Sequence, residues 1–151
     1  MDIIEFSDEY FMKQALAEAE KAYEANEVPI GAVIVCDQRI VARGHNLTER
    51  LHDCTAHAEM QAFTSASDYI GGKFLNECIL YVTLEPCLMC AGAAKWVRIG
   101  KIVYGARDEK QGYTSLKRDV LHPKTIVEQS EMADECGAIL KKFFNERRLS
   151  K

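Results

Sequence analysis

The sequence contains two short stretches, His57-Ala58-Glu59 and Pro86-Cys87-Leu88-Met89-Cys90, around which the rest of the chain must be organised. The first offers an imidazole and, two residues later, a carboxylate. The second offers two thiols at positions i and i+3, which share one face of a helical turn. Proline is favoured at the first position of a helix, so Pro86 predicts that a helix begins there. The N-terminus of that helix would favour the ionised form of both thiols and prepare them to bind a metal.

Together these side chains predict a catalytic zinc site. His57, Cys87 and Cys90 supply nitrogen and sulfur, the ligand atoms that Zn²⁺ prefers. Closed structural sites have four protein ligands, whereas a site with three protein ligands leaves the fourth position to water. Bound zinc lowers the pKa of that water toward about 7. Glu59 is then predicted to move protons as a general acid–base.

Cys54 leaves a non-catalytic alternative open. The pairs Cys54-x-x-His57 and Cys87-x-x-Cys90 together have the spacing of a closed Cys₃His site, which would make the protein a zinc-stabilised module without enzymatic activity. That alternative gives Glu59 no role. The catalytic interpretation carries a geometric condition, because residues i and i+2 of a regular helix point to nearly opposite sides. His57 is therefore expected in the first turn of its helix.

Composition predicts one compact domain over residues 1–151, with 48% hydrophobic and 28% charged residues. The N-terminus has no signal-peptide pattern and no apolar run reaches membrane-spanning length, so no membrane contact and a cytoplasmic location are expected. Cysteines in such a protein stay reduced, and Cys36, Cys78 and Cys136 are interpreted as small buried hydrophobic side chains. The net charge of −4 argues against general nucleic-acid binding, so any RNA contact must be local.

Hydrophobic periodicity predicts helices and strands in alternation, which indicates an α/β fold. Helices are predicted after the N-cap Ser7 as far as residue 25, from the N-cap Thr55 to before Gly71, over residues 87–96 and from about residue 132. Strands are predicted over residues 30–36, 39–43, 78–83, 101–104 and 125–129. Residues 44–54 are expected to form a loop that leads to the metal. The polar segment 108–124 carries no pattern from which a conformation can be predicted.

These motifs resemble those of the zinc-dependent nucleoside and nucleobase deaminases, whose signature is H-x-E followed by P-C-x-x-C. More of the chain, from about residue 10 to about residue 148, is similar to the bacterial tRNA adenosine deaminases. The similar segments are residues 28–33, Asp53 with residues 55–59, and residues 83–87, 91–93, 98–100 and 133–136. The resemblance implies a cytidine-deaminase-like three-layer α/β/α fold with a five-stranded mixed sheet. It also implies one Zn²⁺ per subunit and a homodimer whose two subunits both contact RNA.

The resemblance further implies a substrate, the wobble adenosine in the anticodon loop of a tRNA, and a product, inosine. Asn46 would help to hold the base and Ile30 would form part of the pocket wall. Arg147 and Arg148 would meet phosphates while Phe144 packs near an unstacked base. Read without the resemblance, Asn46 is equally a turn residue, Ile30 a strand core residue and the basic tail a solvated helix end.

A deaminase of a free base or nucleoside, such as guanine or cytosine, is the second enzymatic interpretation. It shares the core motif, and the acidic balance of the chain slightly favours a small substrate. The flanking sequence favours tRNA, although residues 112–115 depart from the usual pattern of the tRNA editors.

Overall fold

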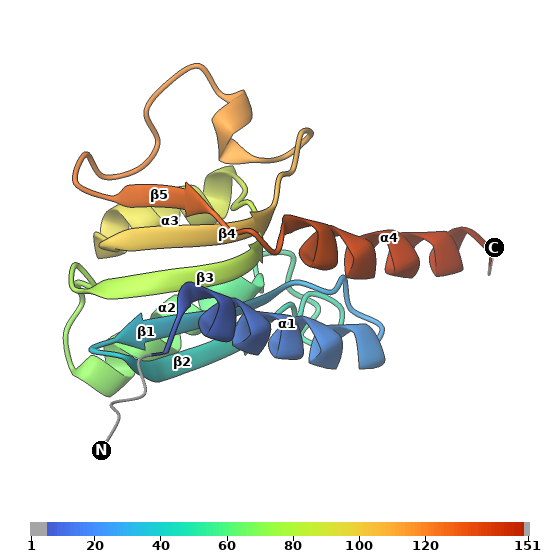
Figure 1. The fold of residues 1–151 in the computed structure, drawn as a ribbon, viewed down its shortest axis with the longest axis horizontal. Coiled ribbons are helices and arrows are strands. Elements are labelled where there is room, and N and C mark those ends of the chain that lie inside the picture. Colours follow the sequence, from blue (N-terminus) through green and yellow to red (C-terminus); the bar gives the residue numbers. More distant parts are fainter. Residues whose placement is uncertain (1–5, 150–151) are drawn as a thin grey trace.

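The computed structural model describes residues 6–149, along which four α-helices alternate with five β-strands (Figure 1). The elements in chain order are α1 (Asp8–Glu24), β1 (Gly31–Cys36), β2 (Arg39–His45), α2 (Ala58–Ile70), β3 (Cys78–Leu84), α3 (Leu88–Val97), β4 (Lys101–Ala106), the 3₁₀ helix η1 (Tyr113–Ser115), β5 (Ile126–Gln129) and α4 (Ala133–Leu149). Every predicted helix and strand is present. None of the described helices combines the length and the apolar composition that a membrane span needs.

The strands form one mixed sheet in the order β2-β1-β3-β4-β5. β1 is antiparallel to both β2 and β3, whereas β3 pairs parallel with β4, and β4 pairs parallel with β5. The helices α2 and α3 cover one face of this sheet, and α1 and α4 cover the other (Figure 1). The predicted three-layer α/β/α fold with a five-stranded mixed sheet is therefore confirmed.

Each face of the sheet has its own hydrophobic core, because alternate residues of a strand point to opposite faces. In β1, Ala32 and Ile34 belong to the core beneath α2 and α3. Val33 and Val35 belong to the core beneath α1, which includes Phe11. A strand that is covered on both faces has a continuous apolar sequence, and this explains why β1 shows no polar alternation.

The N-cap residue was predicted correctly for α1 and wrongly for α2. The side chain of Ser7 accepts a hydrogen bond from the N–H of Tyr10 at 3.2 Å and caps α1, as predicted. Thr55 does not cap α2, because its N–H and its hydroxyl both donate to Oδ1 of Asp53. The N-cap is His57 instead, so α2 begins later than expected.

β2 continues beyond its predicted end and includes Gly44 and His45, so the loop toward α2 begins at Asn46. A Cβ atom at Gly44 would lie only 2.5 Å from the carbonyl oxygen of Ala58. Glycine therefore lets the first turn of α2 contact the end of this strand. The strand and the helix start are held together directly beside the predicted metal ligand.

Pro86 lies one residue before the N-cap of α3, which is Cys87, and not at the first helical position as predicted. The backbone is extended here because it pairs with a distant segment. The carbonyl oxygen of Pro86 accepts a hydrogen bond from the N–H of Tyr113 at 2.9 Å, and Cys87 forms an isolated β-bridge with Gly112. This pairing fixes the position of Cys87 ahead of the helix.

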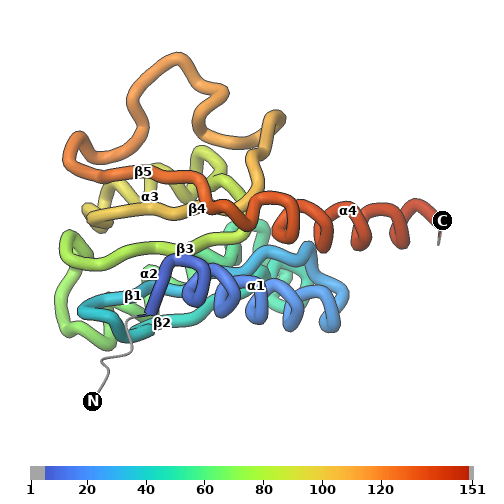
Figure 2. The backbone as a smooth tube through the Cα atoms, viewed as in Figure 1, coloured from blue at the N-terminus to red at the C-terminus, as the bar shows by residue number. Residues whose placement is uncertain are grey.

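Residues 107–125 form a long arch between β4 and β5, which Figure 2 shows as the excursion at one edge of the molecule. Within this segment η1 is the single regular element. Its path depends on hydrogen bonds to a side chain that is far away in the sequence. This dependence explains why no local pattern predicted it.

Candidate active site

The three predicted zinc ligands lie together where α2 and α3 begin. His57 and Cys87 are the N-cap residues of the two helices, and Cys90 follows one turn into α3. Nδ1 of His57 lies 3.6 Å from Sγ of Cys87 and 3.5 Å from Sγ of Cys90. The three potential ligand atoms all lie within 4.8 Å of one another. The expectation that His57 lies at the start of its helix is confirmed.

These distances fit a tetrahedral zinc ion. Zinc binds sulfur at about 2.3 Å and nitrogen at about 2.0–2.1 Å, so neighbouring N and S ligands of a tetrahedral site are roughly 3.6 Å apart. The two observed N···S distances have this value. The chemistry of the donors agrees as well, because one imidazole and two thiols are a common zinc ligand set.

Hydrogen bonds within the cluster favour charge separation even before a cation is added. The hydrogen bond from Cys90 holds the pKa of Cys87 well below its usual range, and the hydrogen bond to His57 acts in the same direction. The same bond between the thiols raises the pKa of Cys90, and burial adds to the rise. Hydrogen bonding to Cys87 raises the pKa of His57, helped by the backbone carbonyl of Cys54. The Cys87 side chain is thus prepared to act as a thiolate.

Glu59 lies in the first turn of α2 and is almost fully buried, with 4% of its surface exposed. Burial raises the pKa of its carboxyl to about 7. A group with a pKa near the ambient pH can both accept and release a proton, which is what general acid–base chemistry requires. Glu59 lines the same cavity as His57 and Cys87.

That cavity has a volume of about 1110 Å³ and connects the cluster to the C-terminal helix. It brings together all five residues predicted to bind substrate, which come from three separate parts of the chain. These residues are Ile30, Asn46, Phe144, Arg147 and Arg148. A cavity of this size is slightly larger than the usual range for small-ligand sites, about 300–1,000 Å³.

Asn46 reaches the cavity but also organises the backbone around it. Its Nδ2 donates to the carbonyl of Val28 at 3.4 Å, and its Oδ1 accepts from the N–H of Thr48 at 3.1 Å. A primary amide has two N–H donors and an oxygen with two lone pairs. One donor and one lone pair of Asn46 thus remain for a ligand.

Sequence reasoning missed two buried carboxylates that hold the loops around the cavity. The first is Glu27, which is 1% exposed. Its two oxygens accept hydrogen bonds from the N–H groups of Glu49 and Arg50, each at 2.9 Å. The loop that leads to His57 is thereby tied to the segment after α1.

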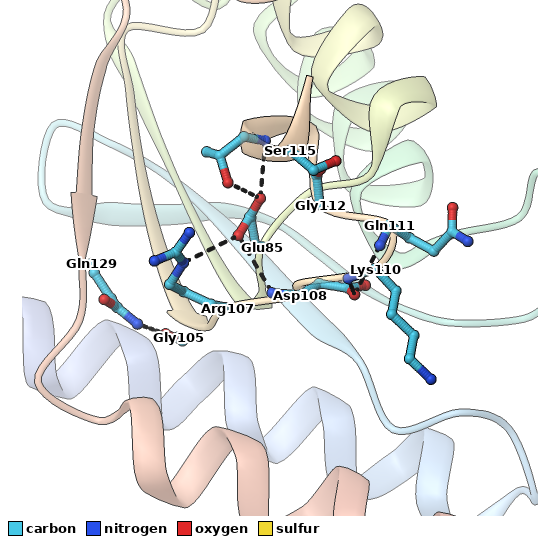
Figure 3. Close-up of polar contacts among 10 residues, drawn as sticks. Glu85, Gly105, Arg107, Asp108, Lys110, Gln111, Gly112, Ser115 and Gln129 are labelled. Carbon is cyan, nitrogen blue, oxygen red and sulfur yellow. Dashed lines mark hydrogen bonds and ion pairs between the residues drawn. The ribbon is translucent and has the colours of Figure 1, made fainter. Parts of the chain in front are cut away.

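The second buried carboxylate is Glu85, which holds the start of the arch (Figure 3). Its Oε1 accepts from the N–H of Asp108 at 3.3 Å, and its Oε2 accepts from the N–H and the hydroxyl of Thr114 at 3.1 and 2.8 Å. The guanidinium of Arg107 lies 4.0 Å from Oε1. A Cβ atom at Gly112 would lie 2.0 Å from Oε2, so the loop can pass this carboxylate only with glycine there. The sequence signal was a single carboxylate between an apolar strand and a proline.

In α4, two of the three residues predicted to contact RNA form hydrogen bonds within the protein. Arg147 donates to the carbonyl of Asn26 at 2.5 Å, and its guanidinium lies 4.7 Å from the ring centre of Phe143. Arg148 donates to the side chain of Asn145 in the same helix. Phe144 is 47% exposed beside the cavity. Arg147 therefore helps to attach α4 to the segment that follows α1.

Cys54 does not join the cluster. Its side chain is exposed, and among residues 6–149 the group of potential ligand atoms comprises only His57, Cys87 and Cys90. Cys54 contributes its backbone carbonyl to His57 and not its sulfur to the metal position. This geometry contradicts the closed Cys₃His site, the structural alternative that the sequence left open.

Comparisons with known proteins agree with this geometry. The model of the cytidine and deoxycytidylate deaminase zinc-binding region matches residues 6–106. The tRNA-specific adenosine deaminase of Bacillus subtilis (strain 168) is 44% identical over 149 residues, which is 95% of this chain and 92% of that protein.

Two solved structures are also similar. One, from a study of A-to-I editing by tRNA:A34 deaminases at the wobble position, is 42% identical with a TM-score of 0.82, over 87% of this chain and 99% of that chain. The other is an X-ray structure of guanine deaminase from Bacillus subtilis, 40% identical with a TM-score of 0.65, over 68% of this chain and 66% of that chain.

Proposed function

Since this chain belongs to the cytidine and deoxycytidylate deaminase family, we propose that it converts adenosine to inosine at the wobble position of a tRNA by zinc-dependent hydrolytic deamination. One observation carries the proposal: a single cavity reaches from His57, Glu59 and Cys87 to the basic end of α4. A base at the floor of this cavity would meet the reacting groups, and the RNA backbone around it would meet the helix.

The residues of the cluster have distinct roles in this reaction. His57, Cys87 and Cys90 would hold one Zn²⁺ per subunit, and the metal would supply Lewis-acid activation of a water molecule. Glu59 accepts a proton from that water and delivers it to the ring nitrogen beside the amino-bearing carbon. It then takes the remaining proton from the new hydroxyl group on that carbon and delivers it to the departing amino group, so that the C–N bond breaks and a carbonyl forms. One water is consumed and one ammonia is released in each turnover.

The base is held by the part of the cavity nearest the cluster. The free N–H donor and the free lone pair of Asn46 suit the edge of a base, which itself offers donors and acceptors. Ile30, directly before β1, contributes an apolar wall. Glu27 keeps the loop around Asn46 in place through its two hydrogen bonds.

The RNA around the base is contacted by α4. Phe144 is an exposed aromatic ring beside the cavity, and exposed rings of this kind stack on unpaired bases. Arg148 lines the same cavity and, among residues 6–149, donates only to Asn145 of its own helix, so it can turn toward a phosphate. Arg147 is anchored to Asn26, and we assign it mainly to holding the helix in position.

The alternative substrate, a free base such as guanine, is supported by one of the similar structures. In the structural comparison, the Bacillus subtilis guanine deaminase is matched over 68% of this chain with a TM-score of 0.65, whereas the structure from the study of tRNA:A34 deaminases is matched over 87% with a TM-score of 0.82. The larger overlap, together with a cavity that extends to α4, favours the tRNA substrate.

We also propose a homodimer in the cytoplasm. Two large exposed apolar side chains on α3 support the dimer, because Trp96 is 83% exposed and Leu88 is 55% exposed. Large exposed apolar side chains often mark contacts between proteins. Sedimentation analysis tests this proposal, and a monomer at micromolar concentration would remove it.

The experiment that tests the function compares wild type with Glu59→Ala on an anticodon stem-loop, on free guanine and on free cytosine. The wild type should form inosine in the stem-loop, and the variant should lose about 10²–10⁴-fold in rate while retaining its zinc. Zinc is measured by metal analysis of the same samples. Activity on a free base alone would overturn the tRNA assignment, and loss of zinc by the variant would overturn the role given to Glu59.

A further inference from the structure

A second pair of thiols lies at the end of the sheet that is remote from the candidate active site. β1 runs away from the cavity and ends at Cys36, while β3 begins at Cys78 and runs toward the cavity-lining Leu84. Cys36 and Cys78 are directly opposite each other in the antiparallel pairing of these strands. Their sulfur atoms are 2.8 Å apart, and both cysteines are free thiols.

The backbone explains this close approach. The N–H of Cys78 donates to Leu75, and its carbonyl oxygen accepts from Gly100, each at 3.1 Å. Both backbone groups of Cys78 therefore point away from Cys36, which makes the two cysteines a non-hydrogen-bonded pair. In such a pair the Cα atoms are only about 4.5 Å apart, and the side chains are closer than in the other type.

A disulfide needs Cα atoms about 4.4–6.8 Å apart and Cβ atoms about 3.5–4.5 Å apart. The pairing of β1 with β3 thus holds Cys36 and Cys78 at a separation that a disulfide can bridge, without movement of either strand. Both cysteines were predicted to be small buried hydrophobic side chains, which is correct for Cys78 and wrong for Cys36, because Cys36 ends its strand beside an exposed turn and is partly exposed. Their contact depends on a strand register that the sequence does not reveal.

The two thiols differ in access. Cys36 is partly exposed and precedes the exposed turn at Asp37 and Gln38, so a small oxidant can reach it. Cys78 is 2% exposed, and burial raises the pKa of its thiol to about 12. An oxidant would therefore react first at Cys36, with Cys78 waiting behind it.

We propose that Cys36 and Cys78 form a two-electron redox site, which a peroxide converts into a cross-strand disulfide and a dithiol reductant restores. Sγ of Cys36 attacks one peroxide oxygen, the O–O bond breaks, and the products are a sulfenic acid and water. Sγ of Cys78 then attacks the Cys36 sulfur, the S–O bond breaks, and the hydroxide leaves as water with the Cys78 proton. Two thiols and one hydrogen peroxide give one disulfide and two waters. This site is independent of the proposed function.

The disulfide would close a long loop between two central strands. A link of this kind restricts the unfolded chain and raises the unfolding temperature by roughly 5–10 °C. Because the link lies at the opposite end of the sheet from His57, Cys87 and Cys90, the zinc content should not change.

The test uses the zinc-loaded wild-type protein, treated with a small excess of hydrogen peroxide and then with N-ethylmaleimide. Digestion with trypsin and chymotrypsin, which cleaves after Tyr81, separates Cys78 from the zinc-binding thiols. Mass spectrometry should then find the Cys36 and Cys78 peptides joined, two fewer free thiols, and unchanged zinc. Dithiothreitol should restore both thiols.

Two variants sharpen the result. Cys54→Ser removes an exposed thiol outside the pair and should still form the link, whereas Cys36→Ser should lose both the link and the peroxide-induced rise in unfolding temperature. A sulfinic acid at Cys36 without a link would overturn the proposal. So would a link from Cys36 to Cys54, or a disulfide that forms only as zinc is lost.

Discussion

β3 connects two pairs of cysteines that have the same side chains and different chemistry. Cys78 begins the strand and faces Cys36 across an antiparallel ladder. Cys87 follows the end of the strand, and Cys90 lies one helical turn later. At the second pair an imidazole nitrogen lies within 3.6 Å of each sulfur, which gives a group of three side chains that can hold a metal ion.

The difference between the pairs follows from the backbone that presents them. The thiols at the start of α3 lie near unpaired N–H groups and the positive end of the helix, which stabilise a thiolate. The strand offers the other pair no such groups, and burial raises the pKa of Cys78. The local fold therefore decides whether two neighbouring cysteines bind a cation or can bond to each other.

The largest effect on zinc content and deamination is expected from a substitution in the pair Cys87 and Cys90, and none from one in the pair Cys36 and Cys78. Cys90→Ala should lose the zinc and reduce deamination of the stem-loop to below about a thousandth of the wild-type rate, because a two-ligand site cannot hold a catalytic zinc. Cys78→Ala should keep both. Metal analysis and the initial rate of inosine formation measure the two effects. Full zinc occupancy in the Cys90 variant would show that the metal lies elsewhere.

Glu85→Gln should have an intermediate effect, confined to the metal-site end of β3. Either orientation of the glutamine amide places an NH₂ group against the N–H of Asp108 or of Thr114, so the start of the arch loses a hydrogen bond and meets a repulsive contact. The loss of about 1–3 kcal/mol corresponds to about 5–150-fold in kcat/KM. The zinc content and the reaction between Cys36 and Cys78 should stay the same.

Steady-state kinetics of Glu85→Gln on the stem-loop, beside Glu27→Gln as a matched change in the other loop, measure this effect. A rise in KM with unchanged zinc would identify Glu85 as a positioning residue. Loss of zinc from Glu85→Gln would instead show that the arch supports the metal ligands themselves.

The smallest expected effect is on RNA binding. It tests whether a positive charge contributes to binding only when it lies beside the cavity. Arg148→Ala should weaken stem-loop binding several-fold and lower the salt dependence of the binding constant by about one unit of slope, because one phosphate contact is lost. Lys73→Ala is the control, since this exposed lysine lies before β3 at the other end of the strand. Equal losses in both variants would mean that the charge at α4 has no special role.

Arg148 is a better target than the pair of arginines. Arg147 donates to the carbonyl of Asn26, so removing it also loosens the attachment of α4 beside α1. A double variant would combine a change in stability with a change in RNA contact. The single substitution keeps these effects apart.

The sequence predicted what depends on local pattern. The cap Ser7, the strand order along the chain and the place of His57 at a helix start all follow from neighbouring residues. The prediction that Thr55 caps α2 was wrong because Thr55 donates to the nearby Asp53 instead. Both interactions are local, and the sequence pattern does not show which of them forms. The candidate zinc ligands could be predicted because the spacing of His57, Cys87 and Cys90 in the sequence is typical of zinc-binding residues.

What the sequence could not predict depends on contacts between distant segments. Glu85 and Glu27 appear in the sequence as charged residues without partners, because their partners are backbone N–H groups in remote loops. The path of residues 108–124 depends on that contact. The pairing of Cys36 with Cys78 needs the register of β1 against β3. None of these features produces a periodic pattern in the sequence.

The contact between Glu85 and the arch leaves part of the cavity lining open to substitution. Glu85 holds the loop mainly by backbone N–H groups at residues 108 and 114, and not by the side chains between them. Residues 109–111 line the cavity but take no part in this contact. These three residues can therefore be substituted while the loop keeps its path. Substitutions at these three positions would change the cavity lining and leave the hydrogen bonds to Glu85 in place, provided that residue 112 remains glycine.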